Sequence, residues 1–227
     1  MLDPAPAKAL AFLMPQDRNA PALFGIVLYP TVEPIDLGAT YGVLSMARRI
    51  LPNIRAVTLA ANPETVTLAG GIAVSIDHTL DDAPPLDVAI VTGGAGWPEA
   101  ATDPAMLAFL RRRPAPIMAS VCTGALILLA AGLLDGRPAT TRRTALGTEP
   151  RSPLSRLPTP REATVVDTGN VVTGGGVTLS TDTTLHLIAR LYGEPAAWDV
   201  ARAIEYDRAW TSNLAALGTI QPETRAA

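Results

Sequence analysis

The fold of this chain is decided at Pro116-Ile-Met-Ala-Ser-Val-Cys-Thr-Gly-Ala-Leu-Ile-Leu-Leu-Ala-Ala-Gly132. The apolar run 117–121 predicts a buried strand, and the Ala- and Leu-rich run 124–131 predicts a packed helix. Cys122 lies at their junction with no room for a loop, and the small residues Ser120 and Gly124 lie two positions before and after it. This spacing is typical of a nucleophile elbow, a tight turn that lifts one side chain clear of the sheet.

Two interpretations of Cys122 compete. An unpaired cysteine is often only a small buried hydrophobe. At the start of a helix, however, the free N–H groups favour a thiolate, so a cysteine on an elbow is expected to be reactive near neutral pH. Because a structural cysteine has no need of small neighbours on both sides, we interpret Cys122 as a nucleophile.

Composition narrows the possible classes of protein. The 227 residues are 48% hydrophobic, enough for the core of one domain, and the net charge of −3 predicts no surface for nucleic acid or an anionic membrane. One cysteine and two separated histidines, His78 and His186, do not have metal-ligand spacing, so no metal is expected. The apolar run 9–14 is too short for a signal segment or a membrane span, and a cytoplasmic location is expected.

Buried strands alternate with helical segments along most of the chain. Strands are expected at 23–29, 55–61, 64–75, 86–92 and 117–121, with a hairpin turn at Gly70-Gly71 within 64–75, and a further hairpin is expected at 164–173. Helices are expected at 36–51, after an Asp103 cap with Pro104 at the first helical position, and at 124–131, 180–192 and 195–206. Ser180 or Thr181 is the expected cap of the helix at 180–192, and Gly193 its end. This order predicts one α/β domain at 23–206, with a mostly parallel sheet covered by helices on both faces. An N-terminal extension is expected at 1–22 and a C-terminal tail at 207–227.

The candidate site residues follow the carboxyl ends of strands, where sites form in parallel sheets. Asp36 comes after the first strand and can act as an acid or base, although the same position suits a helix N-cap. Gly94, Ala95 and Thr123 are candidates for oxyanion or substrate binding through their backbone N–H groups. For the glycines, an ordinary turn at a strand end is the alternative.

Several motifs carry a family resemblance. They are Tyr29-Pro-Thr-Val-Glu-Pro-Ile-Asp-Leu-Gly38, Asp87-Val-Ala-Ile-Val-Thr-Gly-Gly94, Ser120-Val-Cys-Thr-Gly124 with Ala131-Gly-Leu-Leu-Asp-Gly-Arg137, Ala139-Thr-Thr141, and Val172-Thr-Gly-Gly-Gly176. In this order they resemble the isonitrile hydratase branch of the ThiJ/PfpI superfamily. The resemblance implies a flavodoxin-like, class I glutamine amidotransferase-like sandwich and a homodimer. It also implies a cofactor-free hydro-lyase that converts a small isonitrile and water into an N-substituted formamide.

The resemblance also implies roles for individual residues. Cys122 matches the nucleophile and Asp36 the acid/base, and Thr123 is expected to position water or substrate. Relatives usually carry Ala-Thr-Thr-His where this chain has Ala139-Thr-Thr-Arg142. Arg142 thus takes the place of the histidine, so a cysteine–histidine dyad is not expected. Arg142 either lowers the pKa of the thiol or is a solvated arginine beside Arg143.

Two other functions are compatible with the same residues. The domain also occurs as the ligand-binding sensor half of AraC-type regulators, which is a non-catalytic role. The superfamily further includes enzymes that detoxify α-oxoaldehydes and peptidase-like enzymes.

Overall fold

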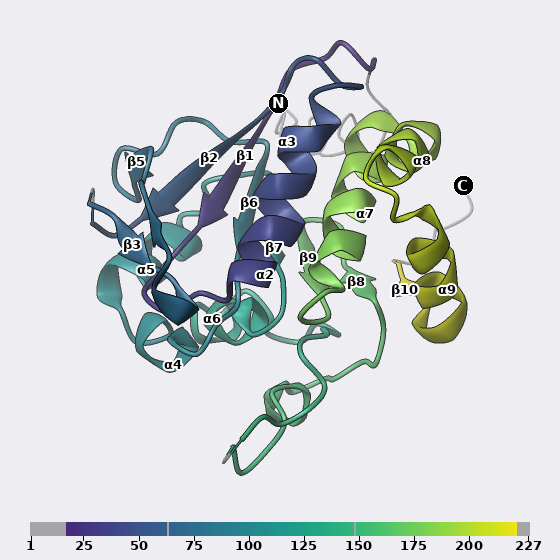
Figure 1. Ribbon diagram of the computed structural model, residues 1–227. Helices are drawn as coiled ribbons and strands as arrows, with labels where there is room; N and C mark the ends of the chain where they lie inside the picture. Colours follow the sequence, from purple (N-terminus) through teal and green to yellow (C-terminus); the bar gives the residue numbers. More distant parts are fainter. Residues whose placement is uncertain (1–16, 63, 148, 222–227) are drawn as a thin grey trace, which may run out of the picture.

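An eight-stranded sheet forms the centre of the molecule in the computed structural model, which describes residues 17–62, 64–147 and 149–221 (Figure 1). The strand order is β10-β8-β9-β7-β6-β1-β2-β5. The strands are β1 (Ala22–Val27), β2 (Ile54–Ala60), β5 (His78–Thr79), β6 (Val88–Val91), β7 (Ile117–Ser120), β8 (Val165–Asp167), β9 (Val171–Gly174) and β10 (Thr219–Ile220). Every pairing in this sheet is parallel except the β8–β9 hairpin, so the predicted, mostly parallel sheet is confirmed.

Helices cover both faces of the sheet (Figure 1). One face carries α2 (Pro34–Leu37), a π-helical turn at Gly38–Gly42, α3 (Val43–Ala47), α7 (Ser180–Tyr192) and α8 (Glu194–Ala203). The other face carries α4 (Trp97–Ala100), α5 (Pro104–Arg111) and α6 (Gly124–Ala130). The central strands β6 and β7 are therefore buried at every position, which explains their uninterrupted apolar sequence.

Several local signals have the structure that the sequence predicts. Asp103 accepts two backbone N–H groups and caps α5, with Pro104 at its first position. Gly193 ends α7 at φ +87°. A two-stranded antiparallel hairpin, β3 (Val66–Thr67) and β4 (Ala73–Val74), surrounds the expected glycine turn. None of the helices in the described ranges is long and apolar enough to cross a bilayer.

The C-terminal segment differs from its prediction as a tail. Residues 207–221 form α9 (Asp207–Leu217) and β10, and β10 pairs in parallel with β8. Trp210 of α9 packs on Trp198 of α8 with 4.4 Å between the ring centroids, which docks the segment on the domain. Residues 1–16 of the expected extension and 222–227 of the expected tail lie outside the described residues.

α6 approaches the backbone of β6 closely at Gly124. A Cβ atom at this position would lie 2.2 Å from the carbonyl oxygen of Val91 and 2.8 Å from that of Thr92. These are backbone atoms of the central sheet, so they cannot turn aside as a side chain can. The glycine after the elbow is therefore required by the packing of helix on sheet.

Gly124→Ala is expected to lower the free energy of unfolding by about 1–3 kcal/mol, because it forces α6 away from β6. Gly42→Ala is the matched control, since Gly42 has helical φ and ψ and a methyl group there would meet nothing within 4 Å. It is expected to raise the free energy of unfolding by about 0.5–1 kcal/mol. Urea denaturation measures both, and equal effects of the two substitutions would contradict the packing argument.

Candidate active site

Cys122 lies on a sharp turn between β7 and α6. Its φ of +50° is a left-handed conformation, which costs a non-glycine residue about 1–2 kcal/mol. Two contacts hold this conformation: the Cys122 N–H donates to the Gly175 carbonyl (3.1 Å), and the Thr141 hydroxyl donates to the Cys122 carbonyl. The strand-to-helix junction predicted from the sequence is present.

Two glycines lie directly against the cysteine. A Cβ atom at Gly93 would be 2.6 Å from Asp36 Oδ2 and 2.6 Å from Cys122 Cβ, and one at Gly176 would be 2.7 Å from Cys122 Sγ. The carboxylate and the cysteine therefore face each other across Gly93. At Gly176 the sequence predicts no more than a turn, although its place after β9 puts it at the same edge of the sheet.

Asp36 is completely buried and fully hydrogen-bonded. Its Oδ1 accepts the Ser180 hydroxyl and its Oδ2 accepts the Gly93 N–H, both at 2.9 Å. Burial raises the pKa of this carboxyl group to about 7, and the hydrogen bonds oppose that rise only in part. The interpretation of Asp36 as a helix cap is wrong, because α2 begins at Pro34 with Glu33 as its N-cap.

Ser180 is a site residue that the sequence suggested only as a helix cap. Leu179 is the N-cap of α7, and the Ser180 side chain points instead to a carboxylate 144 positions earlier in the chain. One feature of the sequence could have indicated that Ser180 belongs to the site. Ser180 comes shortly after the glycines 174–176, which follow the end of a strand of the sheet.

The Cys122 thiol differs from the expectation of a thiolate near neutral pH. Burial raises the pKa of the thiol well above its ordinary value, and the neighbouring Asp36 carboxylate raises it further. The Thr123 N–H and the positive charge of Arg142 lower the pKa of the thiol, but by less. The first N–H groups of a helix therefore do not outweigh the desolvation of the sulfur.

In the expected donor pair of Gly94 and Thr123, the Gly94 N–H is already bonded to another atom. The Gly94 N–H donates to Thr123 Oγ1 (2.9 Å), and the Ala95 N–H donates to the Thr31 carbonyl (3.1 Å). The Thr123 hydroxyl in turn donates to the Gly94 carbonyl (3.2 Å), so this side chain clamps the loop. Only the Thr123 N–H faces the sulfur.

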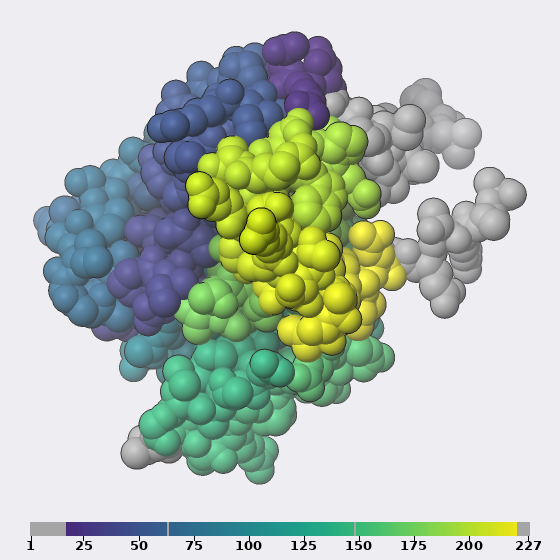
Figure 2. All heavy atoms as spheres, turned by 45° about the vertical axis from the view of Figure 1, so that its right-hand side comes forward, coloured from purple at the N-terminus to yellow at the C-terminus, as the bar shows by residue number. Residues whose placement is uncertain are grey.

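A cavity of about 400 Å³ opens over the cysteine. Its lining residues are Glu33, Gly94, Ala95, Cys122, Thr123, Arg142, Leu146, Gly147, Glu149 and Val177. Part of this wall comes from residues 143–147 and 149–160, which project from the body of the domain (Figures 1 and 2). The volume suits a small-molecule ligand.

Arg142 faces this cavity, so its interpretation as a solvated residue is wrong. Its side chain is buried and donates to Glu149 Oε1 and to the Thr144 carbonyl, both at 2.6 Å. Arg143 points outward and pairs with Glu162 (2.9 Å). The two neighbouring arginines therefore point in different directions, and each is paired with a different glutamate. The positive charge near the sulfur is held in place by Glu149.

The histidines stand apart from the cysteine cavity. His186 of α7 is buried against Asp167 (2.8 Å), and His78 lies in β5. Among residues 17–62, 64–147 and 149–221, no group of three or more His, Cys, Asp or Glu side chains is placed to hold a metal ion.

Comparison with known proteins agrees with the motifs. The model of the DJ-1/PfpI family matches residues 24–190. The isonitrile hydratase of Pseudomonas putida is 36% identical over 184 residues, which cover 80% of this chain and 77% of that protein. The HTH-type transcriptional regulator GbdR of Pseudomonas aeruginosa is 29% identical over 198 residues, or 86% of this chain, but this chain spans only 53% of the regulator.

Solved structures agree on the fold. A ThiJ/PfpI family protein from Pseudomonas syringae superposes with a TM-score of 0.72 at 31% identity, covering 83% of this chain and 76% of that one. Drosophila melanogaster DJ-1beta superposes with a TM-score of 0.69 at 20% identity, covering 82% and 98% of the two chains. The likeness to DJ-1beta concerns the fold alone.

The two charged neighbours of Cys122 are expected to shift its reactivity in opposite directions. Asp36→Asn removes a negative charge and should lower the pH midpoint of Cys122 alkylation by iodoacetamide, whereas Arg142→Ala removes a positive charge and should raise it. Arg143→Ala is the control, because this arginine is exposed and paired with Glu162. Midpoints that move together would contradict the arrangement.

Proposed function

The chain belongs to the DJ-1/PfpI family, and from this premise we propose that it is a cysteine-dependent isonitrile hydratase. The reaction would convert an isonitrile and water into an N-substituted formamide without a cofactor. The observation that carries the proposal is the buried carboxyl group of Asp36, which faces Cys122 across Gly93 and has a pKa raised by burial to about 7. The 36% identity to a hydratase supports it.

Hydration of an isonitrile begins with two additions to the same carbon. A sulfur and a proton both join the terminal carbon, so a nucleophile and an acid must meet there. Asp36 would take the Cys122 proton as the sulfur attacks and pass that proton to the carbon, which gives a thioimidate. The high pKa of the thiol makes this transfer necessary, because little free thiolate is present at neutral pH.

Water completes the reaction at the same carbon. Asp36, again a carboxylate, would accept a proton from the attacking water and pass it to the thioimidate nitrogen. It would then move the hydroxyl proton of the adduct to the sulfur as the carbon–sulfur bond breaks. The products are the formamide and the thiol of Cys122, so the atoms and protons balance and the site is restored. The Arg142–Glu149 pair in the lining of the cavity would hold its wall in place during these steps.

The shortage of free backbone donors also favours this chemistry over acyl transfer. Acyl transfer needs preorganised donors for an oxyanion, and removal of one such donor typically costs about 10²–10³-fold in rate. Here the Gly94 and Ala95 N–H groups are already bonded to other atoms. Addition to an isonitrile instead needs a proton delivered to the carbon, which is the role proposed for Asp36.

A ligand-binding role is the second candidate. The similarity to GbdR covers 86% of this chain, and the raised thiol pKa describes a cysteine that does not react on its own. In that role the cavity over Cys122 would bind a small molecule without turning it over.

An alkyl isonitrile, such as cyclohexyl isonitrile, tests the proposal directly. The full chain is expected to release the formamide, detected by mass spectrometry, and Cys122→Ser is expected to fold but to lose turnover, because serine is similar in size and a much weaker nucleophile. Turnover by Cys122→Ser would refute the nucleophile assignment. Absence of formamide from the unsubstituted chain would refute the hydratase and leave the binding role.

Asp36 is expected to set the pH dependence of turnover. The acid/base pair works with one proton shared between Asp36 and Cys122, so kcat/KM should rise as pH increases through about 7, when Asp36 loses its own proton. Asp36→Asn should reduce kcat/KM by about 10²-fold or more and abolish this rise. Asp135→Asn removes an exposed carboxylate and serves as the control. An unchanged pH profile in Asp36→Asn would remove Asp36 from the mechanism.

A further inference from the structure

The cavity over Cys122 contains an acidic side chain that the proposed mechanism does not use. Glu33 lines this cavity, is half-buried, and comes directly before α2. The Gly93 peptide bonds to both acidic residues of this segment: its carbonyl accepts the Glu33 N–H, and its N–H donates to Asp36 Oδ2, both at 2.9 Å. The loop that faces the cysteine therefore fixes the backbone of Glu33 beside the site.

Glu33 makes none of the structural contacts expected of a glutamate at a helix start. It is the N-cap of α2, but its side chain makes no capping hydrogen bond. None of the ion pairs among the described residues involves it. Its charge does reach the site, because the Glu33 carboxylate adds to the rise in the Asp36 pKa that burial chiefly causes.

The other two charged side chains in the lining neutralise each other. Arg142 donates to Glu149 Oε1 at 2.6 Å, and the other oxygen of that carboxylate accepts the Leu146 N–H (2.9 Å). Among the described residues of the lining, Glu33 is thus the charged side chain with no opposite charge beside it. The cavity has an excess of negative charge, and ionised Asp36 adds to it. Protein walls of low dielectric strengthen the effect of such a charge.

From this distribution of charge we propose that Glu33 makes the cavity over Cys122 select small molecules with a positively charged group over those with a negatively charged group. An anionic group would be repelled by Glu33 without gaining the guanidinium of Arg142, which Glu149 already holds. In the hydratase proposed above, on which the identity of the substrate rests, the preferred substrate would be an isonitrile with a protonated amine on its alkyl group.

Two thiol reagents that differ in charge test this selection without any turnover. The 2-aminoethyl and 2-sulfonatoethyl methanethiosulfonates both form a mixed disulfide with a thiolate and release methanesulfinate, and Cys122 is the one cysteine of the chain. Each labelling rate, measured by mass spectrometry, is divided by the rate with free 2-mercaptoethanol. At low ionic strength the cationic reagent should have the higher normalised rate, and Glu33→Gln should reduce the ratio of cationic to anionic rates at least about 5-fold.

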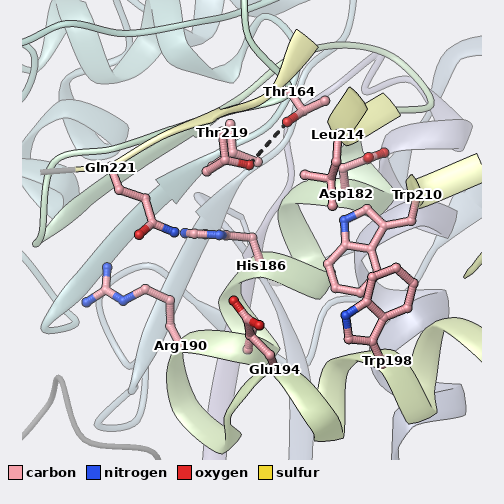
Figure 3. Close-up of a pocket in the computed structure, with 12 residues that line it drawn as sticks. Thr164, Asp182, His186, Arg190, Glu194, Trp198, Trp210, Leu214, Thr219 and Gln221 are labelled. Atoms are coloured by element: carbon pink, nitrogen blue, oxygen red, sulfur yellow. Dashed lines mark hydrogen bonds between the residues drawn. The ribbon is translucent and has the colours of Figure 1, made fainter. Parts of the chain in front are cut away.

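Glu194→Gln is the matched control. Glu194 is also an exposed glutamate at the start of a helix, α8, but it lines a separate cavity between α7, α8 and α9 (Figure 3). None of the residues around that cavity lines the one over Cys122, so this substitution should leave the ratio unchanged. Because Glu33 is partly exposed, high salt should bring the ratio of the unsubstituted chain close to that of Glu33→Gln. A role of Glu33 in folding alone would not produce this salt dependence.

Turnover then separates this inference from the proposed function. The value of kcat/KM should be higher for 3-(dimethylamino)propyl isonitrile than for isocyanoacetate, and Glu33→Gln should reduce that preference. A labelling ratio that is the same in the unsubstituted chain and in Glu33→Gln would overturn the role of Glu33, whether or not formamide is formed. A labelling ratio that depends on Glu33, with no formamide from any isonitrile, would refute the hydratase and support charge selection by the cavity.

Discussion

The left-handed turn at Cys122 is the constraint on which the architecture of this protein depends. A cysteine at φ +50° persists only because neighbouring segments hold its backbone from both sides, through Gly175 and Thr141. Room for the turn comes from glycines at Gly93, Gly124 and Gly176, each so close to other atoms that a side chain would clash. The ends of three neighbouring strands, β6, β7 and β9, thus converge on one sulfur atom.

Burial governs the chemistry of that sulfur more strongly than the helix behind it. Desolvation raises the pKa of both Cys122 and Asp36, so above about pH 7 Asp36 is a carboxylate that can accept the proton still held by the Cys122 thiol. The arrangement differs from a preformed thiolate, which a helix N-terminus or a cation would stabilise alone. In the proposed hydratase the nucleophile is generated only as the proton leaves, which ties attack on the substrate to protonation of its carbon.

The C-terminal elements extend the domain beyond the core that the motifs describe. β10 adds a strand beyond the antiparallel β8–β9 hairpin, and α9 packs on α8 through the two tryptophans. This packing encloses Asp182 and leaves one of its oxygens without a donor. The cavity lined by Glu194, Trp198 and Trp210 follows from how these last elements dock, and none of its lining residues lines the cavity over Cys122.

Local sequence determined the alternation of strands and helices in 23–206 apart from the short β5, and also the Asp103 cap, the β8–β9 hairpin and the position of Cys122 at a strand-to-helix junction. Periodicity, capping and turn chemistry act between near neighbours, which is why they could be predicted. The approach of Asp36 to Cys122 also followed, since the carboxyl ends of parallel strands share one edge. Only the tertiary structure decided the direction of the thiol pKa, the inward turn of Arg142 and the docking of residues 207–221. Each of these depends on desolvation or on a partner far along the chain, as with Ser180 on Asp36, and no local pattern encodes such a contact.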